Sequence, residues 1–256
     1  MHLSSYLCLF WMIALVQGFS RFRLSKRKMQ QTFLSSGFTY DENQPLQKIY
    51  NHLRQISQSP DYDRVVQQPV GNILIEKCFE EMNNLKLNDF GLTEVNLKNV
   101  KNNYCLNIAC NDKFHIALFI LGKQGELPLH DHPKMTVLSK VLYGSLDVGS
   151  YTKVNSTSTD VTTVTLDYRV TRTPSDNGWL LTPNNGNIHS FSNSDILKPC
   201  LIFDILMPPY LDDEDRPCNF YKISGDLCST YYLENIPEPE NLPLSVNYNG
   251  YKPIDV

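Results

Sequence analysis

The chain has 256 residues, of which 41% are hydrophobic, so it is long enough for one large β domain or two small ones. Its 27 acidic residues exceed its 23 basic residues and give a formal net charge of -4. A chain without a basic excess lacks the field that attracts nucleic acid, so no nucleic-acid partner is expected. Fifteen prolines, twelve glycines and fourteen tyrosines fit a turn-rich β protein.

Residues 1–41 have little sign of a fold, and we expect a leader segment there. The apolar run at residues 7–16 has the length of a signal-peptide core and is too short to span a bilayer. No Lys or Arg precedes this run, whereas Arg21, Arg23 and Lys26 follow it, which is closer to an organelle-targeting pattern. We expect a cytoplasmic protein without stable membrane insertion, with mitochondrial targeting and secretion as the alternatives.

Two amphipathic helices are expected within residues 42–90. Leu46, Ile49 and Leu53 recur at helical spacing in residues 42–58, and a second helix is expected over residues 72–85. The charged segment 59–64 contains a proline and is expected to be a linker between them. We expect both helices to pad one end of a barrel.

From about residue 100 the pattern becomes that of β-strands, and a barrel is expected over residues 100–210. The strands are predicted at residues 105–109, 114–121, 136–148, 179–182 and 200–206. Residues 151–173 are rich in Thr, Ser and Val, which favours a surface hairpin inserted between the two halves of the barrel. Pro208 and Pro209 end the last strand because adjacent prolines cannot continue a ladder. A tail at residues 211–256 is expected to wrap irregularly over the surface.

The chain has seven cysteines, and none of them forms a Cys-x-x-Cys pair. A structural zinc site is therefore not expected. The odd number and scattered spacing of the cysteines indicate reduced thiols in a reducing compartment.

Three of the six histidines lie in two short motifs. His130 and His132 are two positions apart, and on a β-strand such residues point to the same face. We therefore expect them to bind one metal ion while Asp131 points the other way, as a surface or strand-register residue. His189 lies in the second motif, further along the chain.

Glycines and an asparagine surround these histidines in a characteristic arrangement. Gly125 and Gly144 flank the first motif, Gly186 precedes His189 by three positions, and Asn193 follows it by four. This arrangement resembles the two-part signature of the cupins. It implies a mainly β fold, a cupin barrel (double-stranded β-helix, or jelly roll) with N-terminal helices. The signature says little about function, because cupins carry out many chemistries.

Three neutral imidazoles suit Fe(II), Zn, Cu or Ni. The usual cupin adds a carboxylate four or five residues after the His-x-His pair, but here those positions hold Thr136 and Val137. A site without a protein anion leaves room for a substrate that brings its own anion, such as a thiolate, alongside O2, because metal coordination deprotonates a thiol. A zinc hydrolase that uses three histidines and a water stays open.

A more specific similarity lies in four segments, residues 127–133, 140–144, 181–189 and 203–210. Together they resemble the cysteamine (2-aminoethanethiol) dioxygenase / plant cysteine oxidase family, with a match over residues 42–256. The resemblance implies a non-haem Fe(II) thiol dioxygenase that oxidises an amino-thiol to a sulfinic acid with O2. The implied substrates are cysteamine and proteins with an N-terminal cysteine, and oxidation of the latter implies an oxygen-sensing role. By position, His130, His132 and His189 would be the iron ligands.

Three further residues are candidates for the site. Asp204 lies in an apolar strand, where a charge is costly unless it is paired. We expect it to accept the substrate amine or to anchor a ligand imidazole, with a structural aspartate bonded to the backbone as the alternative. Tyr143 and Tyr210 are expected as wall residues whose hydroxyls bind the thiol or the oxygen, with core packing as the alternative.

The sequence departs from the family at two places. Lys134 stands where the family usually has glycine. Some animal members join a cysteine to the tyrosine two positions on, but here Cys218 is followed at that distance by Phe220. Tyr221 would face the opposite side of a strand, so no crosslink at Cys218 is expected.

Two alternatives to the thiol dioxygenase stay open. One is a metal-dependent cupin of another type, a zinc or nickel isomerase or hydrolase, and the other is a non-catalytic cupin that only binds a ligand. For the dioxygenase, we expect a monomer whose partners are O2 and a small amino-thiol or a peptide that begins with cysteine.

Overall fold

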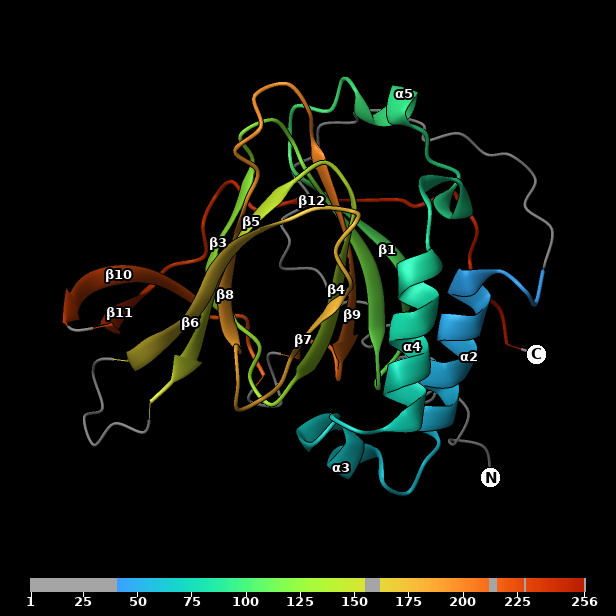
Figure 1. Ribbon diagram of the computed structural model, residues 1–256, viewed down its shortest axis with the longest axis horizontal. Coiled ribbons are helices and arrows are strands. Elements are labelled where there is room, and N and C mark those ends of the chain that lie inside the picture. Colours follow the sequence, from blue (N-terminus) through green and yellow to red (C-terminus); the bar gives the residue numbers. More distant parts are fainter. Residues whose placement is uncertain (1–40, 155–161, 212–215, 228, 256) are drawn as a thin grey trace, which may run out of the picture.

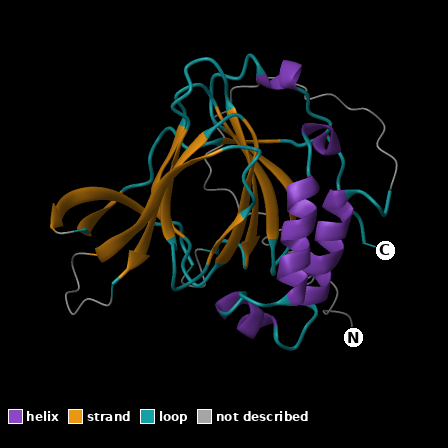
Figure 2. Cartoon of the chain, viewed as in Figure 1, coloured by secondary structure: helices purple, strands orange, loops and turns teal. Residues whose placement is uncertain are grey.

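The computed structural model describes residues 41–154, 162–211, 216–227 and 229–255. Two β-sheets face each other, and helices cover the outer side of one of them (Figures 1 and 2). The expected fold class, a mainly β jelly-roll barrel with N-terminal helices, is confirmed. The expected leader, apart from Asp41, lies outside the described residues.

The first sheet has six strands in the spatial order β12, β1, β2, β9, β4 and β7. All neighbours are antiparallel except β12 and β1. The bounds are β1 Tyr104–Cys110, β2 His115–Leu121, β4 Thr136–Tyr143, β7 Trp179–Leu181, β9 Cys200–Met207 and β12 Leu244–Val246.

The second sheet also has six strands, and it closes on itself in the order β10, β11, β6, β5, β8 and β3. Strand β3 pairs back onto β10 and completes the circle. The bounds are β3 Glu126–Asp131, β5 Leu146–Lys153, β6 Thr162–Arg172, β8 Ile188–Ser192, β10 Phe220–Leu227 and β11 Thr230–Ile236.

Strand β9 shows why these residues form a central strand. Every residue from Cys200 to Met207 is buried, as expected for a strand that is covered on both faces. Phe203 and Ile205 face the helices, whereas Ile202 and Leu206 face the second sheet. Asp204 therefore points with Ile202 and Leu206 into the space between the sheets, because side chains alternate along a strand.

The helices cover a face of the first sheet, not an end of the barrel as predicted. They are α2 Pro45–Ser57, α3 Tyr62–Gln67, α4 Ile73–Asn84, the 3-10 helix η1 Leu87–Phe90 and α5 Glu94–Leu97. Leu46, Ile49 and Leu53 of α2 are completely buried in one cluster with Phe203 of the sheet. This placement follows because the outer face of the sheet is as apolar as the inner face and must also be removed from water.

The bounds of the two long helices agree closely with the prediction, but the linker between them was only partly correct. The side chain of Asn72 accepts hydrogen bonds from the backbone N–H groups of Leu74 and Ile75, which caps the start of α4. Within the predicted linker 59–64, helix α3 begins at Tyr62. Burial of Tyr62, Val65 and Val66 stabilises this short helix against the predicted loop.

The predicted hairpin at residues 151–173 exists, but it is not a surface insertion. Strands β5 and β6 pair as an antiparallel hairpin and are both members of the second sheet. Tyr151 and Val164 are buried in a separate core inside the closed sheet, together with Leu233 of β11. The β-branched composition marked the strands correctly, but it could not show which partners would cover them.

The C-terminal tail is also more ordered than predicted. Strands β10, β11 and β12 all lie within it. Beyond β12, the Tyr251 hydroxyl and the backbone N–H of Ile254 both donate to the side-chain oxygen of Gln47, which is completely buried in α2. This pairing anchors the tail, because a buried amide is costly unless its hydrogen bonds are made.

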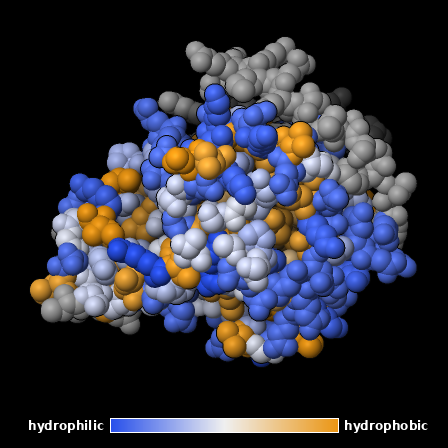
Figure 3. Space-filling view, turned by 45° about the horizontal axis from the view of Figure 1, so that its top comes forward, coloured by the Kyte–Doolittle hydropathy of each residue, from blue (hydrophilic) through white to orange (hydrophobic). Residues whose placement is uncertain are grey.

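The cysteines, the helix lengths and the surface of the protein identify no further functional site in the described residues. The five cysteines in the described ranges form no disulfide. Among the helices of the same ranges, none is both long and apolar enough to cross a bilayer. On the face shown in Figure 3, apolar side chains lie scattered among hydrophilic ones. Such a distribution is normal for protein surfaces and identifies no docking patch on that face.

Candidate metal centre

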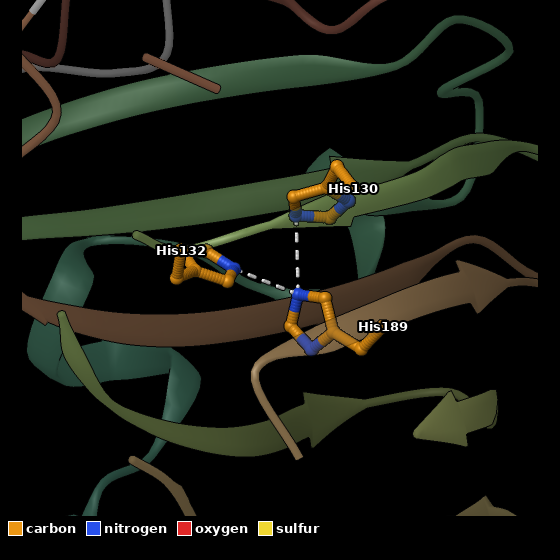
Figure 4. Close-up of side chains that lie close together, drawn as sticks. All are labelled: His130, His132 and His189. Atoms are coloured by element: carbon orange, nitrogen blue, oxygen red, sulfur yellow. Dashed lines mark hydrogen bonds between the residues drawn. The ribbon is translucent and has the colours of Figure 1, made fainter. Parts of the chain in front are cut away.

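Three imidazoles converge between the two sheets (Figure 4). Nε2 of His189 lies 2.9 Å from Nε2 of His132 and 3.1 Å from Nε2 of His130. The three side chains are 1–7% exposed. Within the described residues, these three histidines form a group that can hold a metal ion, and it contains no carboxylate.

Strand register brings the histidines together. His130 of β3 is directly opposite His189 of β8, and His189 is opposite Ser150 of β5. His132 follows the last residue of β3 and keeps the side of the sheet that His130 faces. The i, i+2 prediction for His130 and His132 is therefore consistent with the geometry, although His132 lies just beyond the strand.

Hydrogen bonds show which ring nitrogens carry protons. Nδ1 of His130 lies 2.7 Å from the Pro128 carbonyl oxygen, which can only accept, so Nδ1 is the donor. The Tyr210 hydroxyl donates to the Asp131 carbonyl at 2.7 Å, so its oxygen accepts from Nδ1 of His132, also at 2.7 Å. Nε2 of both histidines is then an unprotonated lone pair that points at the centre of the group.

Burial keeps these rings neutral. It lowers the pKa of His130, and it lowers the pKa values of His132 and His189 well below the usual value. Neighbouring imidazoles add to the lowering at His132 and His189. Neutral imidazole is the form that binds metal, so the site is ready to bind a cation without losing protons first.

A metal ion fits this arrangement on physical grounds. Two lone pairs that face one another at hydrogen-bond distance repel unless a proton or a cation lies between them. Ligands about 2.1 Å from a metal and at right angles are about 3.0 Å apart, close to the two measured Nε2 separations. Nδ1 of His189, on the side of the ring that faces away from the other two histidines, is buried without a hydrogen-bond partner.

Asn187, which was not predicted as a site residue, holds the loop that carries His132. Its side-chain oxygen accepts from the backbone N–H of His132 at 3.1 Å, and its Nδ2 donates to the His132 carbonyl at 2.7 Å. The same Nδ2 also donates to the carbonyl of Thr182. The position of Asn187 two residues before His189 was the only available signal.

The residues that replace the usual carboxylate do not reach the site as ligands. The Thr136 hydroxyl donates to the Val66 carbonyl, and Val137 is buried in the core between the sheets. The protein therefore offers three neutral nitrogen donors at this point of the described chain.

Tyr210, which was predicted to bind the thiol or the oxygen, contacts His132. Its ring stacks on His132 with centroids 5.2 Å apart, and it is also hydrogen-bonded to Cys218. Burial raises the pKa of the Tyr210 phenol, so the hydroxyl stays protonated and can hold the His132 ring in its orientation.

Replacing Tyr210 with phenylalanine is expected to weaken metal binding by about 10- to 100-fold, the usual range for losing a partner of a ligand imidazole. The physical reason is that Nδ1–H of His132 would lose its acceptor inside a buried site. Isothermal titration with Fe(II) under anaerobic conditions measures the change. Tyr143→Phe is the matched control, and equal affinities for the two variants would contradict this role of Tyr210.

Tyr143 does not belong to the site. It packs against the core cluster between the helices and the first sheet, on the face opposite the histidines. A register shift between Val141 and Tyr143 in the pairing with β9 accompanies this placement. The prediction that Tyr143 lines the site is therefore wrong, and the alternative prediction of core packing holds for this residue.

Asp204 lies in the interior, opposite Ser139 of β4. Burial raises its pKa to about 7, and the nearby Ser139 side chain opposes part of this shift. Oδ1 of Asp204 is buried without a well-formed hydrogen bond, although the Ser139 hydroxyl lies close enough to lower the pKa of this carboxyl. A buried carboxyl with an unused acceptor can bind a cationic donor, which suits the expected amine role better than a backbone-bonded structural role.

Lys134 forms the turn between β3 and β4 with a backbone φ of +59°. This left-handed conformation costs a residue with a Cβ about 1–2 kcal/mol, whereas glycine adopts it freely. Lys134→Gly is expected to raise the free energy of unfolding by roughly 0.5–1 kcal/mol after the larger chain entropy of glycine is subtracted. Urea denaturation measures the gain, and Lys134→Ala, which keeps a Cβ, should show none.

The barrel and its three-histidine group define a protein of the cupin class with a candidate metal centre. The chain belongs to the PCO_ADO family, whose model matches residues 80–241. The resemblance noted in the sequence is thereby confirmed.

Two curated relatives illustrate this membership. A probable 2-aminoethanethiol dioxygenase of Dictyostelium discoideum is 37% identical over 44% of this chain and 52% of its own length. Plant cysteine oxidase 2 of Arabidopsis thaliana is 36% identical over 45% of this chain and 42% of its own length. The chain thus spans about half the length of these curated relatives. A solved cupin superfamily protein from Desulfitobacterium hafniense matches with 14% identity and a TM-score of 0.33, over 45% of this chain and 87% of that chain.

Proposed function

We propose that this protein is a non-haem Fe(II) thiol dioxygenase that oxidises an amino-thiol to a sulfinic acid with O2. The observation that carries the proposal is the group of three neutral imidazoles without a carboxylate, in a chain of the PCO_ADO family. Membership of this family does not identify the metal ion, but the three nitrogen donors restrict the choice.

The donor set favours a metal whose anionic ligand comes from the substrate. His130, His132 and His189 bring no charge, so a divalent ion between them keeps its full charge and attracts a thiolate. Imidazole donors suit iron, and three protein ligands on one side leave positions for two more reactants. A ferrous ion bound there would supply redox chemistry with O2 and would lower the pKa of the substrate thiol.

The reaction itself balances without an external reductant. A thiol and one O2 give one sulfinic acid, with both oxygen atoms bonded to sulfur. The four electrons that O2 accepts come from the sulfur atom. The protein must therefore bind the thiol and O2 together and keep other reductants and water out, which fits a site enclosed by side chains such as Phe191 and Phe220.

Residues of this chain have distinct roles in the proposal. The three histidines hold the metal, and Tyr210 and Asn187 hold His132 in place. Asp204 accepts the primary amine of the substrate, because its buried carboxyl has an unused acceptor oxygen. Binding a cationic amine would stabilise the ionised carboxylate at neutral pH.

The names of the relatives point to two substrate classes, 2-aminoethanethiol and cysteine. We extend both to this chain, as cysteamine and as the N-terminal cysteine of proteins. For a protein substrate the rate would follow the oxygen supply, which gives an oxygen-sensing role. A cytoplasmic monomer fits this role, because free thiols and Fe(II) are available in a reducing compartment.

An oxygen-electrode experiment tests the proposal. The protein loaded with Fe(II) should consume O2 when cysteamine or a peptide with an N-terminal cysteine is added, and the product should gain 32 Da by mass spectrometry. The corresponding thiol without an amine, ethanethiol, is the control and should react poorly. Tight zinc binding with no O2 uptake for either substrate would overturn the proposal.

A further inference from the structure

Asp131 lies between His130 and His132 in the chain, but its carboxylate points to the opposite side of the sheet. There it accepts four hydrogen bonds, three from Asn219 just before β10 and one from Tyr221 within β10. The backbone N–H of Asn219 donates to Oδ1 at 3.0 Å, and Nδ2 of Asn219 donates to Oδ1 and Oδ2 at 3.1 and 3.2 Å. The Tyr221 hydroxyl donates to Oδ2 at 2.7 Å.

The backbone of Asp131 takes part in the same junction. Its N–H donates to the Asn219 carbonyl at 3.1 Å, and its own carbonyl accepts from the Tyr210 hydroxyl. The strand pairing between β10 and β3 otherwise consists of one registered pair, Phe220 opposite His130. Asp131 is therefore the main connection between β10 and the strand that carries the metal-binding residues.

The connection between Asp131 and β10 affects the metal centre through the side chains on the other face of β10. Side chains alternate along a strand, so Tyr221 faces Asp131 while Phe220 faces the histidines. The Phe220 ring lies 6.1 Å from the His130 ring, centroid to centroid. Two positions earlier, Cys218 is hydrogen-bonded to Tyr210, whose hydroxyl accepts from Nδ1 of His132.

We propose that Asp131 is a positioning residue of the metal centre. Its hydrogen bonds hold β10 from the face of the sheet that points away from the histidines. Phe220 and the hydrogen-bonded Cys218 and Tyr210 are thereby held against the histidine rings on the other face. The inference deepens the proposed function, since it assumes that the three histidines bind a metal. A carboxylate suits the task because two oxygens can accept from three donor groups at once, whereas an amide has only one oxygen. A surface or strand-register residue was expected at Asp131, and the positioning role gives the register role a function.

The experiment compares metal binding and metal geometry in three purified variants. Asp131→Ala is expected to raise the dissociation constant for Fe(II) by about 10- to 100-fold, the range for lost partners of ligand residues. Tyr221→Phe removes only one of the donors and should give a smaller increase. Asp147→Asn is the matched control, since Asp147 is a partly buried aspartate of the same sheet that accepts from Thr171. It should bind Fe(II) like the unmodified protein.

A second measurement separates positioning from general loss of stability. Each protein is saturated with Co(II), and the visible absorption bands report the ligand geometry of the bound ion. Asp131→Ala and Tyr221→Phe should shift these bands, and Asp147→Asn should not. Tyr221→Phe keeps the test decisive if Asp131→Ala does not fold.

The outcomes distinguish this inference from the proposed function. Unchanged Fe(II) affinity and unchanged Co(II) bands in both Asp131→Ala and Tyr221→Phe would overturn the positioning role alone. An unmodified protein that binds neither metal would overturn both. Metal binding that depends on Asp131, without thiol oxidation, would uphold the positioning role while the proposed function fails.

Discussion

Replacing His189 with alanine is expected to abolish thiol oxidation and to weaken metal binding by more than about 100-fold. Losing a residue that only supports a ligand weakens binding by up to about 100-fold, and losing the ligand itself should cost more. Nε2 of His189 is the central atom of the group, at 2.9 and 3.1 Å from the other two Nε2 atoms. Its removal leaves two donors, too few to compete with water for the ion. Metal analysis after anaerobic loading and desalting, followed by O2 uptake with cysteamine, measures both effects.

The control for His189→Ala is a histidine outside the group. His52 lies on helix α2, away from the space between the sheets, and His52→Ala should keep full metal content. A His189→Ala protein that retains metal and O2 uptake would refute the three-histidine site. Loss of metal in both variants would point to general instability, and circular dichroism would detect it.

Replacing Asp204 with asparagine is expected to remove a large pH dependence of stability from the metal-free protein. Burial raises the pKa of Asp204 to about 7, against an ordinary value of 3.8. Between these two values the folded carboxyl holds a proton that the unfolded one has released, so rising pH destabilises the fold. The stabilisation is fully present below about pH 4 and is lost as the pH rises through about 7.

The magnitude follows from the same linkage. Between pH 5 and pH 8, the unmodified protein should lose about 3 kcal/mol of stability relative to Asp204→Asn. Urea denaturation at several pH values measures the free energy of unfolding of both proteins. Their difference isolates Asp204, because the contributions of the other titrating groups are the same in both proteins. Ser139→Ala is the matched variant. The Ser139 hydroxyl lowers the pKa of Asp204, so without it the loss of stability should occur at higher pH. Parallel stability curves for Asp204→Asn and the unmodified protein would contradict a buried, proton-binding Asp204.

Much of the fold could be predicted from local patterns. The helical spacing of Leu46, Ile49 and Leu53 predicted α2 to within three residues at each end, and the apolar run that forms β9 was placed correctly. These elements were accessible because periodicity depends on neighbours in the chain. The position of the helices on a sheet face, and the three strands in the C-terminal tail, depended on contacts between distant segments, which periodicity does not contain.

The site likewise contains residues that the sequence could predict and residues that only contacts between distant segments reveal. The spacing of His130 and His132 and the turn signals around His189 identified three residues that the structure brings together. Asn187, by contrast, acts through the backbone of His132, 55 positions away, and only the folded chain reveals that pairing. Tyr143 was misplaced because a register shift in β4 turns its side chain away from the histidines.

The amino-acid sequence alone identified the side chains that can bind a metal and showed that no carboxylate accompanies them. It did so because ligand chemistry belongs to residue types and because an i, i+2 spacing fixes a common face. The folded chain was needed to show which ring nitrogens carry protons, that β10 pairs with β3, and how Asp131 joins the two strands on the face away from the histidines. Those properties arise from hydrogen bonds between β3, β8 and β10, and their partners become neighbours only when the two sheets have closed.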